Sequence, residues 1–460
     1  MKKKSLRIIC PNGHMGFAPT KEGSFWIGAE TRPDYYCCDS GSDDIGPGPL
    51  GSDTSVSPYD WQKHDLELML IASRRQGVPM MIGSSGDTGT NSRVDMYVDM
   101  IRQISRKHRI KPFKLVTFYS ELDKADLRRR MQSGDGVEGL DDRPPLTLAE
   151  LDQTDRIVAM AGVHPFVKAL QMGADVIIGG RTSHAAILPA AARHEGFPEN
   201  HSYYLGKVLE CASFCAEPYM AKESVIGTIT HEDVTVAAVH PEQRCTVASV
   251  AGHAMYERSN AYYEYFAGGT LDMTHCRYEQ VDPKSTRVTG QIFLPTVGRT
   301  KVKLEGSGKV GERFIGIVGI RDPYSIQNID HVIGWARSQV EEKFAGKPYQ
   351  LFYNIYGKNG VMGDLEPVRE IRSHELCVIV EGVAPTKEMA EEVTLIGSRQ
   401  IFYARLPEVK GTAGTAAFVI DGVLPAPAGY KWTMNHVLPV NDPMELFKLN
   451  EMVIRDGEEG

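Results

Sequence analysis

The segment from Pro79 to Asp95, PMMIGSSGDTGTNSRVD, constrains the fold more than any other part of the chain. An apolar run of Met80, Met81 and Ile82 stops at a glycine, and glycines then recur at every third position among small hydroxyl residues. A helical pattern begins near Asn91. This order predicts a buried strand, a glycine-rich turn and a helix, which is a building unit of α/β proteins.

The predicted turn is suited to binding an anion. Glycine lets the backbone approach a ligand closely, and the free N–H groups at the start of the next helix attract phosphate, carboxylate or enolate. The spacing matches neither the Walker loop, whose lysine is missing, nor the dinucleotide fingerprint G-x-G-x-x-G. The alternative is a tight turn without a ligand. The candidate substrate-binding residues are Ser84, Ser85, Gly86, Thr88, Gly89, Thr90 and Asn91, and Asp87 is a candidate acid or base.

Length and composition exclude several classes of protein. At 460 residues the chain is long for one core, so two domains are expected. The net charge of -8 argues against nucleic acid or an anionic membrane as a partner. No apolar run reaches the length of about 18 residues that spans a membrane, and no secretion signal is recognisable. We therefore expect a cytoplasmic protein whose scattered cysteines are reduced thiols.

Two further strand ends carry polar residues. The β-type run from Leu6 to Cys10 places His14 just beyond a strand, where open α/β sheets bind ligands, although a loop histidine is often only structural. The run from Tyr35 to Cys38 leads into an acidic segment rich in Gly and Pro. Such carboxylates suit Mg²⁺ or general acid catalysis, and the alternative is an exposed loop that uses Asp at turns. The catalytic candidates are His14, Asp39, Asp43 and Asp44, and the three aspartates are the ligands if magnesium binds.

The segment from Asp175 to Leu188, DVIIGGRTSHAAIL, repeats the same arrangement of strand, glycines and helix start. Arg181 is therefore placed at a strand end beside a helix N-terminus, where its guanidinium suits a bidentate grip on a carboxylate or phosphate. His184 follows as a candidate acid or base, with a helix-packing role as the alternative. The substrate-binding candidates of this segment are Arg181, Thr182 and Ser183.

The alternation of strand and helix patterns predicts a mainly parallel, Rossmann-like sheet covered on both faces. From about Val225 the pattern changes to short β-rich runs, which predict an α+β domain rich in antiparallel strands. We therefore predict an α/β domain over residues 1–223, carrying the glycine-rich loops, and an α+β domain over 224–460 that completes the cleft. Because parallel strands gather their carboxyl-end loops at one edge, the loops at His14, Asp39, Gly83 and Gly179 are expected to meet.

Five motifs taken together resemble the acyclic terpene utilisation AtuA family. In chain order they are PNGHMGFAPTKEGSF, CCDSGSDDIGPGPLGSDTSVSP, GSSGDTGTN, ADVIIGGRTSHAAI and GKVLECASFCAEP. The resemblance implies a bacterial catabolic protein encoded among enzymes that process branched carboxylic acids or their acyl-CoA esters, and it transfers no agreed catalytic set. The tail NHVLPVNDPMELF departs from members that end in a ferredoxin-like module and resembles the variant found beside a small companion protein.

Two functions follow from these observations. The first is a lyase or hydratase acting on a branched or multi-carboxylate organic acid or its acyl-CoA ester. Removing water β to a carboxylate needs a base, an acid and stabilisation of an enolate-like intermediate, and the candidates above supply all three. The second is a non-catalytic ligand-binding subunit or scaffold that works with a small partner protein. A large α/β enzyme of this kind is also expected to be a homo-oligomer.

Overall fold

The computed structural model describes residues 3–258, 260–408 and 416–457. The chain folds into two compact units. The first contains the residues up to Ser307 together with those from Trp432 onward, and the second contains Gly308–Lys431. Every element of the site described below belongs to the first unit.

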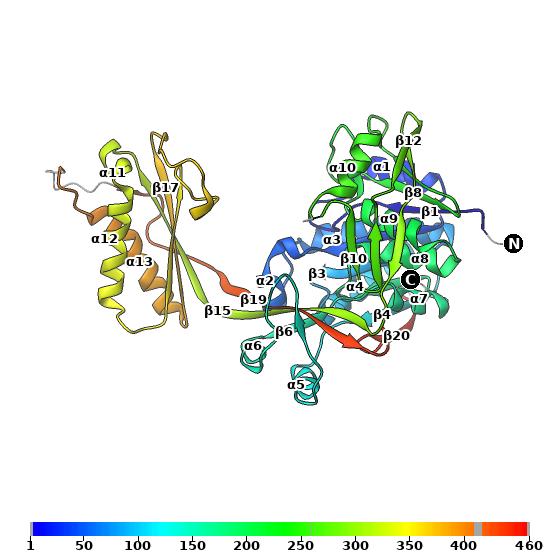
Figure 1. The fold of residues 1–460 in the computed structure, drawn as a ribbon, viewed down its shortest axis with the longest axis horizontal. Helices are drawn as coiled ribbons and strands as arrows, with labels where there is room; N and C mark the ends of the chain where they lie inside the picture. The colour runs from blue at the N-terminus through cyan, green and yellow to red at the C-terminus, as the bar shows by residue number, and fades with distance from the viewer. Residues whose placement is uncertain (1–2, 259, 409–415, 458–460) are drawn as a thin grey trace. The chain divides into compact units, whose positions relative to one another are not determined.

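Ten strands of the described chain form one sheet, in the order β12-β13-β9-β8-β1-β2-β3-β7-β4-β20 (Figure 1). They are β1 (Ser5–Cys10), β2 (Tyr35–Gly41), β3 (Met80–Asp87), β4 (Phe113–Tyr119), β7 (Val176–Gly179), β8 (Val225–Thr230), β9 (Val234–Ala238), β12 (Arg277–Asp282), β13 (Ser285–Thr289) and β20 (Lys448–Ile454). The central strands from β1 to β4 are parallel neighbours. The outer strands are antiparallel, so the protein is mixed α/β and the predicted parallel order holds for the centre only.

The sheet continues past the point where the sequence pattern changes. Strand β8 pairs with β1 along its whole length, with Ser5 opposite Thr230. The predicted division into residues 1–223 and 224–460 therefore falls inside the first unit. The physical reason is that antiparallel strands added to the side of a parallel sheet have the same short β-rich pattern as a separate antiparallel domain.

Helices cover the central strands on both faces, since every residue of β2 and β3 is buried. Helices α3 and α4 pack together on β3, and α7, α8 and α9 pack against β7, β2 and β8 respectively. The apolar side chains of α4 recur at helical spacing and are buried, as in Val94, Val98 and Ile101. The helices of this unit are α1 (Glu22–Glu30), α2 (Pro47–Ser52), α3 (Tyr59–Gln76), α4 (Asn91–His108), α5 (Lys124–Gln132), α6 (Leu148–Asp152), α7 (His164–Gln171), α8 (Ile187–Glu195), α9 (Glu199–Leu209) and α10 (Val247–Met255), with the short 3-10 turns η1 (Asp43–Ile45), η2 (His184–Ala186) and η3 (Ala212–Cys215).

Other strands of the first unit lie outside the large sheet. Strands β10 (Tyr263–Phe266), β11 (Gly269–Asp272) and β14 (Ile292–Pro295) form a small antiparallel sheet. The short strands β5 (Glu138–Gly139) and β6 (Arg156–Ala159) pair with the long strands β19 (Leu424–Val440) and β15 (Thr300–Ile320) respectively. Strand β6 is antiparallel to β15 and lies outside the large sheet.

The second unit has its own core. Strands β16 (Gln350–Tyr356) and β17 (Leu376–Ala384) form an antiparallel sheet with the later part of β15, and β18 (Ala416–Phe418) adds to β15. Helix α13 (Lys387–Tyr403) packs on β17 and on α12 (Ile329–Lys343). The short elements are α11 (Pro323–Gln327) and η4 (Gly363–Leu365). In the described parts of both units, no helix combines the length and the apolar character needed to cross a membrane.

Candidate active site

The loops that follow β1, β2, β3 and β7 meet at one edge of the sheet. The N–H of Met15 donates a hydrogen bond to the carbonyl of Asp39 at 3.1 Å, and the N–H of Ser84 donates to the carbonyl of Gly180 at 2.9 Å. The loops after β1 and β7 are therefore joined to the carboxyl ends of the neighbouring strands β2 and β3, as expected from the parallel strand order.

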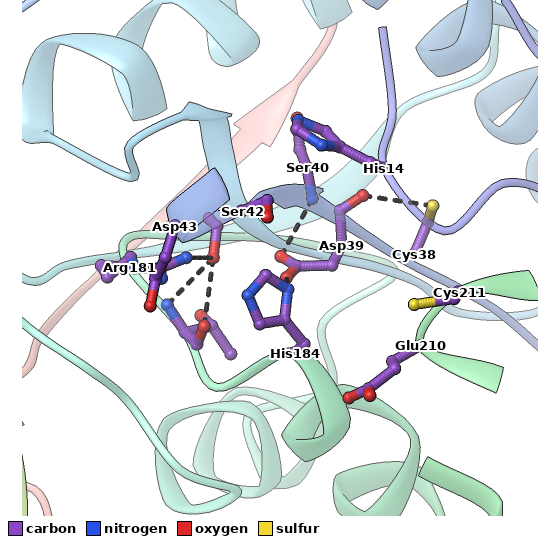
Figure 2. A network of polar contacts seen from close by, with 12 residues as sticks. His14, Cys38, Asp39, Ser40, Ser42, Asp43, Arg181, His184, Glu210 and Cys211 are labelled. Atoms are coloured by element: carbon purple, nitrogen blue, oxygen red, sulfur yellow. Dashed lines mark hydrogen bonds and ion pairs between the residues drawn. The ribbon is translucent and has the colours of Figure 1, made fainter. Parts of the chain in front are cut away.

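His184 faces Asp39 across this edge (Figure 2). Its Nδ1 lies 2.5 Å from Oδ2 of Asp39, whose other oxygen accepts a hydrogen bond from the N–H of Ser40 at 2.9 Å. Burial raises the pKa of the Asp39 carboxyl, but the nearby His184 and Arg181 outweigh it and hold that pKa below its usual range. Asp39 is thus an ionised carboxylate that orients the imidazole and leaves Nε2 as the nitrogen for proton exchange.

His14 forms a second pair of the same kind with Asp87. Its Nε2 lies 3.0 Å from Oδ1 of Asp87. The hydroxyl of Ser57 donates to the same oxygen, and the N–H of Ser57 donates to Oδ2 of Asp87. Burial raises the pKa of Asp87, and the hydrogen bonds from His14 and Ser57 reverse this effect and lower it. The histidines that follow β1 and β7 are therefore each held by a buried aspartate.

Both histidines line one cavity of about 550 Å³, which we call the histidine cleft. Its other side chains include ionisable groups and aromatic rings. The main ones are Phe17, Asp44, Glu210, Cys211, Phe214, Tyr219, Lys222 and Tyr256. Phe17, Phe214 and Tyr219 are 55%, 47% and 61% exposed. The cleft thus combines a few polar groups with an apolar wall, as small-molecule sites commonly do.

A glycine joins two walls of the histidine cleft. A Cβ atom on Gly13 would lie 2.5 Å from the Cα of Cys211 and 2.9 Å from the carbonyl oxygen of Glu210. Only glycine allows this approach, so the loop that carries His14 packs directly on the end of α9. The glycine therefore brings His14 and Glu210 into the same cavity.

Lys222 is the cation of the histidine cleft. Its Nζ donates hydrogen bonds to Oδ1 of Asn12 at 2.9 Å and to the carbonyl of His14 at 3.2 Å. Burial lowers the pKa of Lys222, against the opposing effects of Cys38 and Asp65. Of the three N–H donors of its ammonium group, two have these acceptors, and Nζ also lies 5.8 Å from the centre of the Phe17 ring.

Glu210 is the most buried carboxyl of the histidine cleft, with its side chain 11% exposed. Its Oε1 contacts Nζ of Lys207, which also lies 3.9 Å from Glu264. Burial raises the pKa of Glu210, and the opposing effects of Lys207 and His184 do not cancel it. This wall therefore carries a carboxyl group that holds its proton more tightly than an exposed glutamate does.

The glycine-rich segment that the sequence marked as an anion-binding turn lies largely within β3, which runs on to Asp87, and its side chains are used in internal hydrogen bonds. The hydroxyl of Ser84 donates to the carbonyl of Thr182 at 3.2 Å, and the hydroxyl of Ser85 donates to that of Gly179 at 2.8 Å. Gly89 has a φ of 64° and packs on the backbone of Arg181. Gly86 and Thr88 are the remaining residues of this segment. In the loop after β7, the N–H of Ser183 donates to the carbonyl of Ala161 at 2.9 Å.

Two carboxylates of the protein bind the polar groups at the start of α4. The N–H of Asn91 donates to Oε2 of Glu121 at 2.8 Å. The hydroxyl of Thr90 donates to Oδ1 of Asp53 at 2.7 Å. Two carboxylates of the chain thus occupy the position that the sequence pattern suggested for a substrate.

Arg181 also binds carboxylates of the chain itself. Its Nε lies 2.8 Å from Oε2 of Glu305 on β15, and its Nη2 contacts Asp43. Lys303 lies 2.8 Å from Glu305 and 3.3 Å from Asp43. Burial would raise the pKa of Glu305, but Arg181 and Lys303 lower it to about 2. The guanidinium of Arg181 therefore binds a carboxylate, as its position predicted, but this carboxylate is the side chain of Glu305.

The three aspartates considered as magnesium ligands do not share a site. Asp39 faces His184, Asp43 faces Arg181, and Asp44 lines the histidine cleft. Within residues 3–258, 260–408 and 416–457, no group of three His, Cys, Asp or Glu side chains is arranged to hold a metal ion. Because Mg²⁺ needs several oxygen ligands together, this set does not fit it.

Most residues that line the histidine cleft were not among the sequence-based site candidates, and Glu210, Lys222 and Tyr256 are examples. One signal was present for Lys222, which lies three residues before the start of β8. An antiparallel neighbour begins at the edge where its partner strand ends, so β8 starts beside the loop that follows β1. The sequence did not reveal that pairing. For Tyr256, which follows α10, the sequence holds no comparable signal.

The comparison with protein families gives one result that spans most of this site. The model described as acyclic terpene utilisation family protein AtuA matches residues 58–426, which include His184, Glu210 and Lys222. The chain matches no curated protein and no solved structure. Since the match covers more than half of the 460 residues, the chain belongs to the acyclic terpene utilisation AtuA family.

Proposed function

We propose that this protein is a catabolic enzyme, a lyase or hydratase that removes or adds water beside the carboxyl group of a branched or multi-carboxylate organic acid or its acyl-CoA ester. Membership of the AtuA family supports the catabolic role. One observation carries the chemistry: two histidines, each oriented by a buried aspartate, line the same cleft.

The two pairs supply the two proton transfers of the reaction. One imidazole takes the proton from the carbon next to the carboxyl or thioester group. The hydroxyl on the following carbon then leaves as water with a proton from the other imidazole, and a C=C bond forms. Addition of water is the reverse. Each transfer of this kind contributes about a hundredfold to ten-thousandfold in rate.

Lys222 and the aromatic wall would position the substrate. The ammonium group of Lys222, which lines the cleft, suits a carboxylate or a thioester carbonyl, and a charge-assisted hydrogen bond of this type is worth about 1.5–3 kcal/mol. The rings of Phe214 and Tyr219 stack at 5.2 Å and offer an apolar surface to a branched carbon chain.

The second candidate is a ligand-binding subunit that acts only with a small partner protein. Three half-exposed aromatic side chains, Phe17, Phe214 and Tyr219, gather at the histidine cleft, and a group of exposed apolar side chains marks an interaction site more often than a single one does. This observation favours a partner that covers the cleft. The same rings serve equally well as a substrate surface in the enzyme.

The test uses the purified protein alone with a panel of 2-hydroxy and 3-hydroxy acids, including di- and tricarboxylates, and their CoA esters. Proton NMR detects both the vinyl signals of a dehydrated product and the line broadening caused by binding. The proposal predicts turnover of at least one compound, abolished in His14→Asn and His184→Asn. Binding without turnover of any compound would support the ligand-binding subunit instead.

A further inference from the structure

Lys222 differs from the other cations beside the histidine cleft in the groups that it binds. Arg181 and Lys207 each contact a carboxylate of the chain. Nζ of Lys222 instead donates to the amide oxygen of Asn12 at 2.9 Å and to the backbone carbonyl of His14 at 3.2 Å, which are both neutral acceptors. Within the described residues, no carboxylate forms an ion pair with Lys222. Its hydrogen bonds therefore hold the ammonium group but leave its positive charge uncompensated.

Asn12 is the residue that creates this arrangement. Its side chain is fully buried, and its Nδ2 donates to Oδ2 of Asp65 at 3.1 Å. Its Oδ1 accepts from Lys222 and from the N–H of His14 at 3.0 Å. The reversed amide would place its NH₂ group against these two donors, so the hydrogen bonds fix its orientation. Asn12 thus stands between the carboxylate of Asp65 and the lysine, and presents a neutral oxygen where an aspartate would cancel the charge.

The backbone of Lys222 supports a role for its side chain. Lys222 lines the histidine cleft with a φ of 65°, a left-handed conformation that is unfavourable for a residue with a Cβ atom. Its carbonyl accepts a hydrogen bond from the N–H of Lys21 at 3.0 Å, which helps to hold this conformation. Glycine would suit this backbone better than lysine does. Strained residues of this kind are concentrated at binding and catalytic sites.

We propose that the histidine cleft takes its substrate as a free carboxylic acid, whose carboxylate binds the ammonium group of Lys222, and not as an acyl-CoA ester. This inference rests on the proposed function and narrows its substrate class. A carboxylate supplies both an acceptor and the missing negative charge, whereas the carbonyl of a thioester is neutral. Lys222 is therefore the residue that determines this specificity, and Asn12 is the residue that positions it.

The rest of the histidine cleft fits an acid with a single anionic end. The ring of Phe17 lies 5.8 Å from Nζ of Lys222, so the apolar wall begins beside the ammonium group. Asp44 and Glu257 line the same cleft and are exposed. Their charges repel the phosphate groups of CoA and any second carboxylate that leaves the lysine. The chain of the acid would then extend along the aromatic rings.

Calorimetric titration of the wild-type protein tests the charge requirement. The probes are the acids of the panel above, the primary amides of the same acids, which keep the shape and lose the charge, and the CoA esters. At least one acid should bind about tenfold to a hundredfold more tightly than its amide. Equal affinity for acid and amide, tighter binding of the CoA ester than of the acid, or no binding of any acid would each overturn the inference.

Lys222→Met tests whether Lys222 provides the charge. Methionine keeps most of the length of the side chain, so the preference for acid over amide should disappear while the fold is kept. The matched control is Lys448→Met, because Lys448 is an exposed lysine of β20 outside the histidine cleft, and it should keep the preference. A Lys222→Met protein that still prefers the acid would contradict the assignment.

Exchanging the two side chains behind the lysine tests Asn12. The double variant Asn12→Asp with Asp65→Asn keeps the total charge and a contact between an amide and a carboxylate, but it moves the carboxylate against Lys222. We expect the affinity for the acid to fall at least about tenfold. Thermal unfolding checks that the variant is folded, and wild-type affinity in a folded variant would refute the role of Asn12. If the variant does not fold, the comparison of acid with amide in the wild type still decides the inference.

The outcomes also separate this inference from the proposed function. If acids bind through Lys222 and none of them is turned over, the proposed function fails and the carboxylate site stands. If the CoA esters alone are turned over, and the variants His14→Asn and His184→Asn lose that turnover, the proposed function stands and the carboxylate site is rejected.

Discussion

Nδ1 of His184 and Oδ2 of Asp39 lie 2.5 Å apart, and Asp39 is only 3% exposed. The two residues are far apart in sequence and come from the ends of β2 and β7, which are both neighbours of β3. The contact fixes the ring of His184 by Nδ1 and leaves Nε2 for chemistry. The pair of His14 and Asp87 repeats the arrangement at the ends of β1 and β3.

Asp39→Asn tests the charge of this contact while keeping the size of the side chain. We expect turnover to fall at least about a hundredfold, because the amide can no longer fix and stabilise the imidazole as a proton carrier. Steady-state kinetics on the best compound of the panel measures the loss. Asp330→Asn, on a side chain that is 82% exposed, is the control and should leave turnover unchanged. Equal activity of both variants would mean that His184 acts without Asp39.

Glu305→Gln tests the buried ion pair with Arg181. Removing one charge leaves the guanidinium buried without its partner, which costs about 3–5 kcal/mol of stability. Urea unfolding at neutral pH should show this loss, and Glu370→Gln, whose partner Arg372 is exposed, should change stability by less than about 0.5 kcal/mol. A Glu305→Gln variant as stable as the wild type would contradict a structural role for the pair.

The same pair predicts a pH dependence of stability. The pKa of Glu305 is lowered from 4.5 to about 2 in the folded protein, so the unfolded chain binds its proton first as the pH falls. The stabilisation is complete above pH 4.5 and is lost as the pH approaches 2. The difference in unfolding free energy between wild type and Glu305→Gln should therefore shrink over that interval. If the difference in unfolding free energy instead grew as the pH fell, the prediction would be contradicted.

Arg181→Lys distinguishes a structural arginine from a substrate-binding one. Lysine keeps the charge and loses the planar fork, so we expect a lower melting temperature and an unchanged ligand affinity. Thermal unfolding and calorimetric titration of the same variant give both values. Weaker ligand binding at an unchanged melting temperature would return Arg181 to the substrate site.

Gly13→Ala tests the close approach of the His14 loop to α9. The added Cβ would lie 2.5 Å from the Cα of Cys211, so we expect a loss of about 1–3 kcal/mol of stability together with reduced turnover. Gly23→Ala is the matched control, because Gly23 lies in α1 with no heavy atom within 4 Å of the new Cβ. Chemical denaturation compares the two variants, and equal effects would show that the approach at Gly13 is unimportant.

The local sequence predicted well which residues follow the strands. His14, Asp39 and His184 each stand next to an apolar run that ends in Gly, Pro or Asp, and the parallel order of the strands brings them to one edge. What the local pattern lacks is the identity of distant partners. Arg181 is satisfied by Glu305, which lies 124 positions later, and nothing near Arg181 indicates that its carboxylate is internal.

The glycine-rich turn shows a second limit. The sequence placed its glycines and hydroxyl groups in a turn after Ile82, whereas β3 continues through them to Asp87 and only residues 88–90 separate it from α4. The same groups suit two uses. They can bind a ligand or join two loops, and the choice depends on whether another loop approaches. Here the loop at Gly180 and Arg181 takes the hydroxyl groups of Ser84 and Ser85. That outcome follows from the packing of β3 beside β7, which only the folded chain defines.

The central claim is that the histidine cleft removes a proton from carbon beside a carboxyl or thioester group. The most direct measurement is exchange of that proton with solvent deuterium, followed by proton NMR for wild type, His14→Asn, His184→Asn and the double variant, each incubated in D₂O with the acids and CoA esters that bind. The account predicts exchange by the wild type and its loss in at least one single variant, with the double variant no worse, since residues acting as a unit are not additive. Exchange that persists in the double variant, or a wild-type protein that binds these compounds and exchanges none of them, would contradict it.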